Sequence, residues 1–219
     1  MEPYVDRVDA GRRLAPLVAA ALYPSSAAPL VLALPRGGVP VGAEVAAALA
    51  APLDVLLVRK LGVPARPELA FGAIASGGAR VLNEEIVLAA ALNDAAIAHV
   101  IDAEERELQR RERLYRGDRA APAVDRRTVV VVDDGLATGA TMRVAVLALR
   151  DRGAARVIAA APVGSEEACA LLDSDADAVV CPLVPHRFKA VGAWYNRFTP
   201  VPDEDVGAIL RRAWARIAI

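Results

Sequence analysis

The chain has 219 residues, which is enough to bury one substantial α/β core. Its hydrophobic content is 55% and its formal net charge is −1, so a broad basic surface for nucleic acid or an anionic membrane is disfavoured. We therefore expect neither a nucleic-acid partner nor a membrane.

The uncharged stretch 14–35 follows Arg12 and Arg13, so a signal peptide or a membrane span has to be considered there. Prolines and serines interrupt this stretch, so no apolar run reaches the ~20 residues that a span needs. Acidic residues before the two arginines are also unlike the basic start of a signal peptide. We expect a first helix from about Asp6 to Leu22, then a turn and a buried strand.

Apolar runs and segments of helical period alternate along the rest of the chain. Strands that are apolar on both faces and alternate with helices predict a parallel sheet covered on both sides. The expected fold class is α/β, with a doubly wound, mostly parallel sheet flanked by helices. In chain order we expect strands at 30–34, 53–58, 128–132, 156–161 and 178–181, and helices at 39–50, 94–115, 139–152 and 166–172.

Glycine and proline punctuate residues 61–78, which we therefore expect to be irregular apart from a short hairpin formed by 71–74 and 80–82. Asn83 is expected to cap a short helix that follows the hairpin. Within the long helix at 94–115, the run EERELQRRER alternates in charge. We interpret this run as a solvated helix face rather than a nucleic-acid site.

The two cysteines, Cys169 and Cys181, fall in elements that we expect to be buried. They lack CxxC spacing, and only two histidines could join them in a metal site. Disulfide and zinc interpretations are therefore disfavoured, and the reducing cytoplasm is the expected location.

Unusual residues follow the predicted strands, at the edge where open α/β sheets bind ligands. The stretch VVVVDDGLATGAT, Val129–Thr141, carries two acids from a buried strand into a loop with few side chains. The helix that begins near Gly139 would direct free N–H groups into this loop, which predicts a phosphate site. Two carboxylates would repel a phosphate, so Asp133 and Asp134 should contact sugar hydroxyls or a hydrated Mg²⁺. A phosphorylated sugar fits this pattern.

A second anion site is predicted at PRGG, residues 35–38, where Arg36 supplies charge and two glycines let backbone amides approach a ligand. The alternative is a tight turn from strand to helix. Arg59 and Lys60 add two cations after the strand at 53–58, unless that strand simply ends in solvent. Together these features describe a ligand with anions at two ends and hydroxyls between them.

Residues Val129–Thr141 resemble the phosphoribosyl-pyrophosphate (PRPP) signature of type I phosphoribosyltransferases, and DDGLATGATM is most similar to the adenine-type variants. The stretch PRGGVPVGAEVAAAL resembles the pyrophosphate loop and following helix of the xanthine- and guanine-type enzymes. This resemblance covers about residues 30–184. It implies a single phosphoribosyltransferase domain over 1–219, with a core at about 30–184, a mobile lid loop and helical insertion at about 59–118, and a small C-terminal hood at about 184–219.

The resemblance also implies a role for each matching residue. Asp133 and Asp134 would face the ribose 2′- and 3′-hydroxyls, and Arg36 and Lys60 would complete the catalytic set. Arg36 and Gly37 would contact pyrophosphate through a non-proline cis peptide, as is common in the family. Mg²⁺ would be the cofactor, reached by Asp133 and Asp134 through water or the ribose. The implied 5′-phosphate site is Ala137, Thr138, Gly139, Ala140 and Thr141, and the implied pyrophosphate site is Arg36, Gly37, Gly38, Arg59 and Lys60.

The reaction implied by the resemblance is displacement of pyrophosphate from C1 of PRPP by a nitrogen of a small heterocyclic acceptor. It would be a salvage-type, Mg²⁺-dependent transfer by a homodimer. The alternatives are a non-catalytic PRPP sensor on the same fold and a PRPP-site fold that performs another transfer or a hydrolysis. Ala137 stands where the 6-oxopurine enzymes carry an acid, which puts a hypoxanthine or guanine acceptor in doubt.

The acceptor would lie under the hood, where aromatic residues cluster between residues 184 and 203. Such rings suit stacking on a flat base, with Phe188 and Trp194 as the candidate contacts. The alternatives are that these rings anchor the C-terminal segment on the sheet or form a dimer contact. His186 is interpreted as a structural or surface residue.

Overall fold

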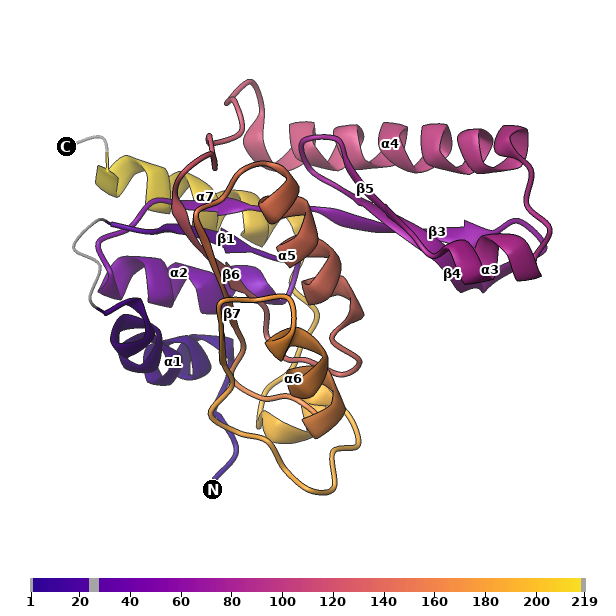
Figure 1. The fold of residues 1–219 in the computed structure, drawn as a ribbon. Helices are drawn as coiled ribbons and strands as arrows, with labels where there is room; N and C mark the ends of the chain where they lie inside the picture. The colour runs from indigo at the N-terminus through magenta and orange to yellow at the C-terminus, as the bar shows by residue number, and fades with distance from the viewer. Residues whose placement is uncertain (1, 24–27, 218–219) are drawn as a thin grey trace.

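The computed structural model describes residues 2–23 and 28–217. A five-stranded parallel sheet lies at its centre, in the order β2-β1-β6-β7-β8. Helices cover both faces of this sheet (Figure 1), so the predicted fold class is confirmed. The strands are β1 (Leu30–Ala33), β2 (Leu53–Val55), β6 (Thr128–Val132), β7 (Arg156–Ala160) and β8 (Ala178–Val180).

Successive residues of the central strands face two different cores, because side chains alternate along a strand. Val130 and Val132 of β6 join the core formed with α1 (Arg7–Leu22), α2 (Gly38–Ala48) and α7 (Asp203–Ile217). Val129 and Val131 join the core formed with α5 (Ala140–Asp151) and α6 (Glu166–Asp173). The unbroken valine run in the sequence is therefore explained by burial on both faces.

The first helix begins where the sequence predicts, because the carboxylate of Asp6 accepts hydrogen bonds from the backbone N–H groups of Val8 and Asp9. The turn expected after this helix includes residues 24–27, which lie outside the described residues. None of the helices within 2–23 and 28–217 has the length and apolarity that a bilayer span requires.

The predicted strand at 53–58 is wrong, because it divides between two sheets. β2 ends at Val55, and the chain then enters β3 (Val58–Val63) of a separate antiparallel sheet with β4 (Arg66–Ala75) and β5 (Ala79–Leu82). The hairpin of β4 and β5 is confirmed, but the irregular region expected at 61–78 is an ordered ribbon. Gly77 and Gly78 form the turn between β4 and β5, with φ of 90° and 85°. Gly72, by contrast, marks a close strand contact, because a Cβ there would lie 2.5 Å from the carbonyl oxygen of Val81.

The ribbon leads into α3 (Glu84–Ala89), which Asn83 caps as predicted by accepting from the N–H of Ile86. The long helix α4 (Asp94–Arg116) then runs back from the ribbon toward α7 (Figure 1). At its end the buried Arg116 donates to Asp54 of β2 across 2.8 Å. One helix therefore links the ribbon to the edge of the central sheet.

The C-terminal segment contains more regular structure than the sequence predicts. After a short 3₁₀ helix, η1 (Val191–Trp194), the chain forms α7, which packs on α2 and α4. The indole N–H of Trp214 in α7 donates to the carbonyl oxygen of Leu53 across 2.9 Å. The last part of the expected hood is thus a helix that covers the edge strand β2.

Candidate functional site

The loops that follow β1 and β6 meet at one edge of the sheet, because these strands are parallel neighbours with Ala33 opposite Val132. A Cβ added to Gly37 would overlap the carboxylate of Asp134, and one on Gly38 would lie 2.5 Å from the carbonyl oxygen of Val132. Only glycine allows this approach. The Pro35–Arg36 peptide bond is cis, so the expected non-proline cis peptide is present in this loop.

Each of the two acids is oriented through one carboxylate oxygen. Oδ1 of Asp133 accepts from the backbone N–H of Asp134 across 2.8 Å, and Oδ2 of Asp134 accepts from Nε of Arg7 across 2.7 Å. The two carboxyl groups also interact directly with each other, through their charges and a side-chain hydrogen bond. Burial, followed by the charge of Asp134, raises the pKa of Asp133 well above its ordinary value. The site therefore holds two close acids, one of which is paired with a cation.

The small-residue loop leads directly into the start of α5. Gly139 has a φ of 72°, and α5 has no side-chain hydrogen bond at its N-cap. Ala137, Thr138 and Ala140 are exposed. N–H groups in the first turn of an uncapped helix can bind an anion. Ser165, the residue before α6, stabilises the loop, because its hydroxyl donates to the carbonyl oxygen of Ala137 across 2.8 Å.

Arg59 and Lys60 are separated by the alternation of β3. Arg59 forms an ion pair of 2.6 Å with Glu104 of α4. Lys60 is exposed and borders a cavity of about 620 Å³ together with Ala140 and Thr141 of α5. The structure therefore brings Lys60, but not Arg59, to the cavity beside the start of α5.

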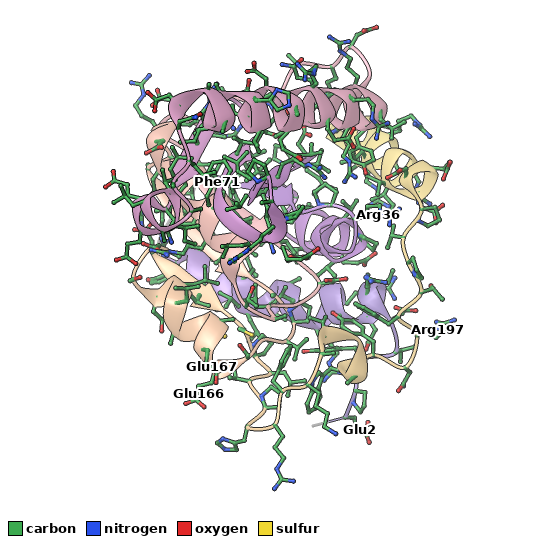
Figure 2. The ribbon with its side chains drawn as sticks, turned by 90° about the vertical axis from the view of Figure 1, so that its right-hand side faces the viewer. Glu2, Arg36, Phe71, Glu166, Glu167 and Arg197 are labelled. Atoms are coloured by element: carbon green, nitrogen blue, oxygen red, sulfur yellow. The ribbon has the colours of Figure 1, made fainter. Side chains whose placement is uncertain are left out.

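Arg36 is exposed, and no other residue that the structure describes forms a hydrogen bond or ion pair with its guanidinium. Figure 2 shows Arg36 beside α2, below α4. Burial, followed by a hydrogen bond to Asp203, raises the pKa of Tyr115 to about 12, and the charge of Arg36 acts in the opposite direction. The Arg36 guanidinium is thus available to a ligand at this edge of the sheet.

Phe188 and Trp194, the two aromatic residues predicted to contact the acceptor, are partly buried against other side chains. Phe188 and Trp194 pack against a buried cluster that includes Tyr4 and Leu183. The carbonyl oxygen of Trp194 also accepts from the N–H of Tyr4 across 2.9 Å. These contacts correspond to the alternative in which the rings anchor the C-terminal segment.

Several residues at this edge were not found by sequence reasoning, and Arg7 is the clearest of them. Besides Asp134, Arg7 contacts the carbonyl oxygen of Thr199 across 2.8 Å, and its Cζ lies 4.0 Å from the ring centroid of Phe198. The hydroxyl of Tyr195 donates to the carbonyl oxygen of Asp134 across 2.6 Å. The only sequence signal was the cap at Asp6, which predicts where α1 begins but not what Arg7 contacts.

Comparison with known proteins adds to this geometry. The sequence profile of the phosphoribosyl transferase domain matches residues 5–195. The chain is 48% identical over 213 residues to two Mycobacterium tuberculosis proteins, MT0597 of strain CDC 1551 / Oshkosh and Rv0571c of strain H37Rv, whose names assign them provisionally to the phosphoribosyl transferases. The match covers 97% of this chain and 47% of each relative, so the chain spans about half the length of these curated relatives.

Solved structures show the same fold. TT1426 from Thermus thermophilus is 43% identical, with a TM-score of 0.84 over 97% of this chain and 99% of that chain. The AQ2163 protein from Aquifex aeolicus is 12% identical, with a TM-score of 0.50 over 85% of this chain and 78% of that chain, and shows a likeness of fold alone. With its doubly wound sheet, its acid-bearing loop and a family match over most of its length, the chain belongs to the phosphoribosyl transferase domain family.

Proposed function

We propose that the chain transfers the 5-phosphoribosyl group of PRPP to a nitrogenous acceptor, a nucleobase-like heterocycle, with release of pyrophosphate. The observation that carries this proposal is the contact between Gly37 and Asp134 beside the start of α5. It brings a loop suited to pyrophosphate, two acids suited to a sugar diol and a helix start suited to a phosphate to one edge of the sheet. PRPP carries these three groups on one ribose.

In this proposal the first turn of α5 and the loop at residues 137–141 hold the 5′-phosphate through backbone N–H groups. Asp133 and Asp134 accept hydrogen bonds from the 2′- and 3′-hydroxyls. Each acid has one oxygen fixed within the protein, and this contact orients the carboxylate for a sugar hydroxyl. The ribose is thereby held at both ends.

The chemical step breaks the bond between C1 and pyrophosphate and forms a bond from C1 to the acceptor nitrogen. Negative charge grows on the leaving pyrophosphate, and positive charge grows on the ribose ring. Arg36 is a cation without a partner among the described residues, so it stabilises the pyrophosphate, while the acids lie near the ring. Lys60 contributes from the ribbon side, whereas Arg59 stays paired with Glu104.

When bound with PRPP, Mg²⁺ would neutralise negative charge on the pyrophosphate and so make it a better leaving group. Within the described part of the chain, no three His, Cys, Asp or Glu side chains gather into a metal-binding group. This donor set fits an ion held mainly by oxygens of PRPP, with Asp133 and Asp134 contacting it through water or the ribose.

We propose that the acceptor enters between the start of α2 and the C-terminal hood. A cavity of about 450 Å³ lies there, bordered by Pro40, Thr199 and Val201, and it also touches Arg7, the partner of Asp134. Phe188 and Trp194 are left out of this acceptor site because they pack against the buried cluster around Tyr4.

The test is pyrophosphate release by the purified chain with PRPP and Mg²⁺ against adenine, guanine, hypoxanthine, xanthine, uracil and orotate. Turnover with any one base, lost in Asp133→Asn/Asp134→Asn, supports the transferase. PRPP binding without turnover across the panel favours the sensor instead. Absence of PRPP binding overturns both.

Salvage of nucleotides in the cytoplasm, by a homodimer, is the setting that we propose for this activity. The assembly is measured by size-exclusion chromatography with light scattering. A mass of one chain at micromolar concentration would contradict the dimer without affecting the proposal for the reaction.

A further inference from the structure

Arg7 forms a largely buried ion pair with Asp134, one of the two acids at the site. Its Nε donates to Oδ2 of Asp134 across 2.7 Å, with only 11% and 14% of the two side chains exposed. An ion pair that is largely removed from water depends on the geometry of both partners, and loss of one leaves the other charge uncompensated. Asp134 therefore depends on a residue 127 positions earlier in the sequence.

Arg7 is itself held in place from the C-terminal hood. Nη1 donates to the carbonyl oxygen of Thr199, and the guanidinium plane lies over the ring of Phe198. A planar guanidinium that donates in two directions and stacks on a ring has little rotational freedom. The position of Asp134 is consequently linked to residues 198–199 through a single side chain.

Gly37 also packs against the Asp134 carboxylate, and the oxygen nearest to it is Oδ2, the one that accepts from Arg7. The same oxygen therefore contacts both the loop after β1 and the arginine that the hood holds. Asp133 is the immediate neighbour of Asp134, and the two negative charges repel each other. Without Arg7 nothing described on the hood side would hold Asp134 in its rotamer against this repulsion.

We propose that Arg7 is a positioning residue for the ribose. It fixes the orientation of Asp134 so that the carboxylate meets a ribose hydroxyl, and it makes this orientation depend on the hood. The inference rests on the proposed function, since it assigns a residue to the ribose subsite of that reaction. Arg7 acts through Asp134 and has no direct role in bond breaking.

The experiment compares Arg7→Met and Arg7→Lys with Arg12→Met, an exposed arginine of the same helix that pairs with Glu44. Calorimetric titrations with PRPP, ribose 5-phosphate and pyrophosphate, each with Mg²⁺, separate the subsites. For Arg7→Met we expect affinity for PRPP and for ribose 5-phosphate to fall about 10- to 100-fold, with pyrophosphate affinity changed less than about twofold. Arg7→Lys should recover part of the loss, and Arg12→Met should match the unmodified chain.

A double-variant cycle tests whether Arg7 acts through Asp134. In an Asp134→Ala background, Arg7→Met should lower ribose 5-phosphate affinity by less than about twofold, because the acceptor of the Arg7 hydrogen bond is already absent. Should Arg7→Met not fold by circular dichroism, Arg7→Gln and Arg7→Lys provide the same comparison.

Three outcomes overturn the inference. Unchanged ribose 5-phosphate affinity in the Arg7 variants removes the positioning role while the proposed function stands. Equal losses for ribose 5-phosphate and pyrophosphate assign Arg7 to general support of the fold. An unmodified chain that binds no PRPP contradicts the proposed function itself, and the inference with it.

Discussion

The Cα atom of Gly37 lies directly against the carboxylate of Asp134, so that the space a Cβ would need is already filled. This contact joins the loop after β1 to the loop after β6. It means that the two motifs recognised in the sequence are parts of one surface. A change in either residue should therefore alter ligand binding at both.

Gly37→Ala should lower PRPP affinity about 10- to 100-fold, because the added methyl group displaces the Asp134 carboxylate. Calorimetric titration measures the affinity. Gly207→Ala is the matched control, since its Cβ would meet only the end of the Arg211 side chain, at 3.1 Å. If Gly37→Ala binds PRPP with the affinity of the unmodified chain, the contact between Gly37 and Asp134 does not matter for PRPP binding and the prediction is wrong.

Asp133→Asn should stabilise the protein at about pH 8. The pKa of Asp133 is raised above its ordinary value of 3.8 by burial and by Asp134, so ionising it in the folded state opposes folding. This cost appears as the pH rises through the folded pKa and is absent below about pH 4, where both states keep the proton. Each kcal/mol relieved should raise Tm by about 2–4 °C.

Thermal unfolding of Asp133→Asn and of the unmodified chain at about pH 4, 6 and 8 measures this difference. The gain in Tm should shrink toward pH 4, while PRPP binding is lost at every pH. A variant that is less stable than the unmodified chain at pH 8 would contradict the direction assigned to this pKa.

Arg116→Met should lower the free energy of unfolding by about 3–5 kcal/mol, because it leaves the buried Asp54 without its cation. Urea denaturation measures the change. Arg110→Met is the control, since Arg110 forms an exposed pair with Glu107 on the same helix and should show no measurable effect. Asp54→Asn/Arg116→Met should recover part of the stability, and an Arg116→Met curve that overlays the unmodified one would refute the prediction.

Cys181 should react slowly with iodoacetamide in the folded protein at about pH 8. Burial, followed by the neighbouring Cys169, raises the pKa of the Cys181 thiol far above its ordinary value. The reactive thiolate is therefore scarce, and labelling should be at least about 10-fold slower than for free cysteine. Peptide mass spectrometry follows each site, and the same chain in urea should label at the ordinary rate. Rapid labelling of folded Cys181 would count against its burial.

The central sheet could be predicted from the sequence because its signals are local. The valine run at 129–132 needs burial on both faces, and the side chains of Asp6 and Asn83 cap helices whose starts lie next to them. The glycines of PRGG indicated a close backbone approach, and the structure supplies its partner in Asp134. The valine strand and the two caps depend on burial alone or on residues that are near in sequence, whereas the partner of Gly37 comes from a distant part of the chain.

The strand β3, its pairing with β4 and the contacts of Arg7 could not be predicted, for a different physical reason. In β3 and β4 the glycines lie against neighbouring strands, but a glycine in the sequence indicates a turn equally well. The pair of Arg7 and Asp134 forms only once α1, β6 and the hood are assembled, and no local pattern encodes that contact. The helix α7 was missed because the aromatic and proline residues before it favoured an irregular segment throughout.

The alternation of Arg59 and Lys60 along β3 has a consequence for how this chain is aligned with others. Side chains alternate along a strand, so the position of each basic residue in β3 decides which of the two borders the cavity beside the start of α5. Deletion of one residue between Leu57 and Arg59 would exchange the two, turning a guanidinium toward α5 and an amine toward Glu104. A relative that keeps both basic residues but differs by one residue before them would therefore present a different cation at this site.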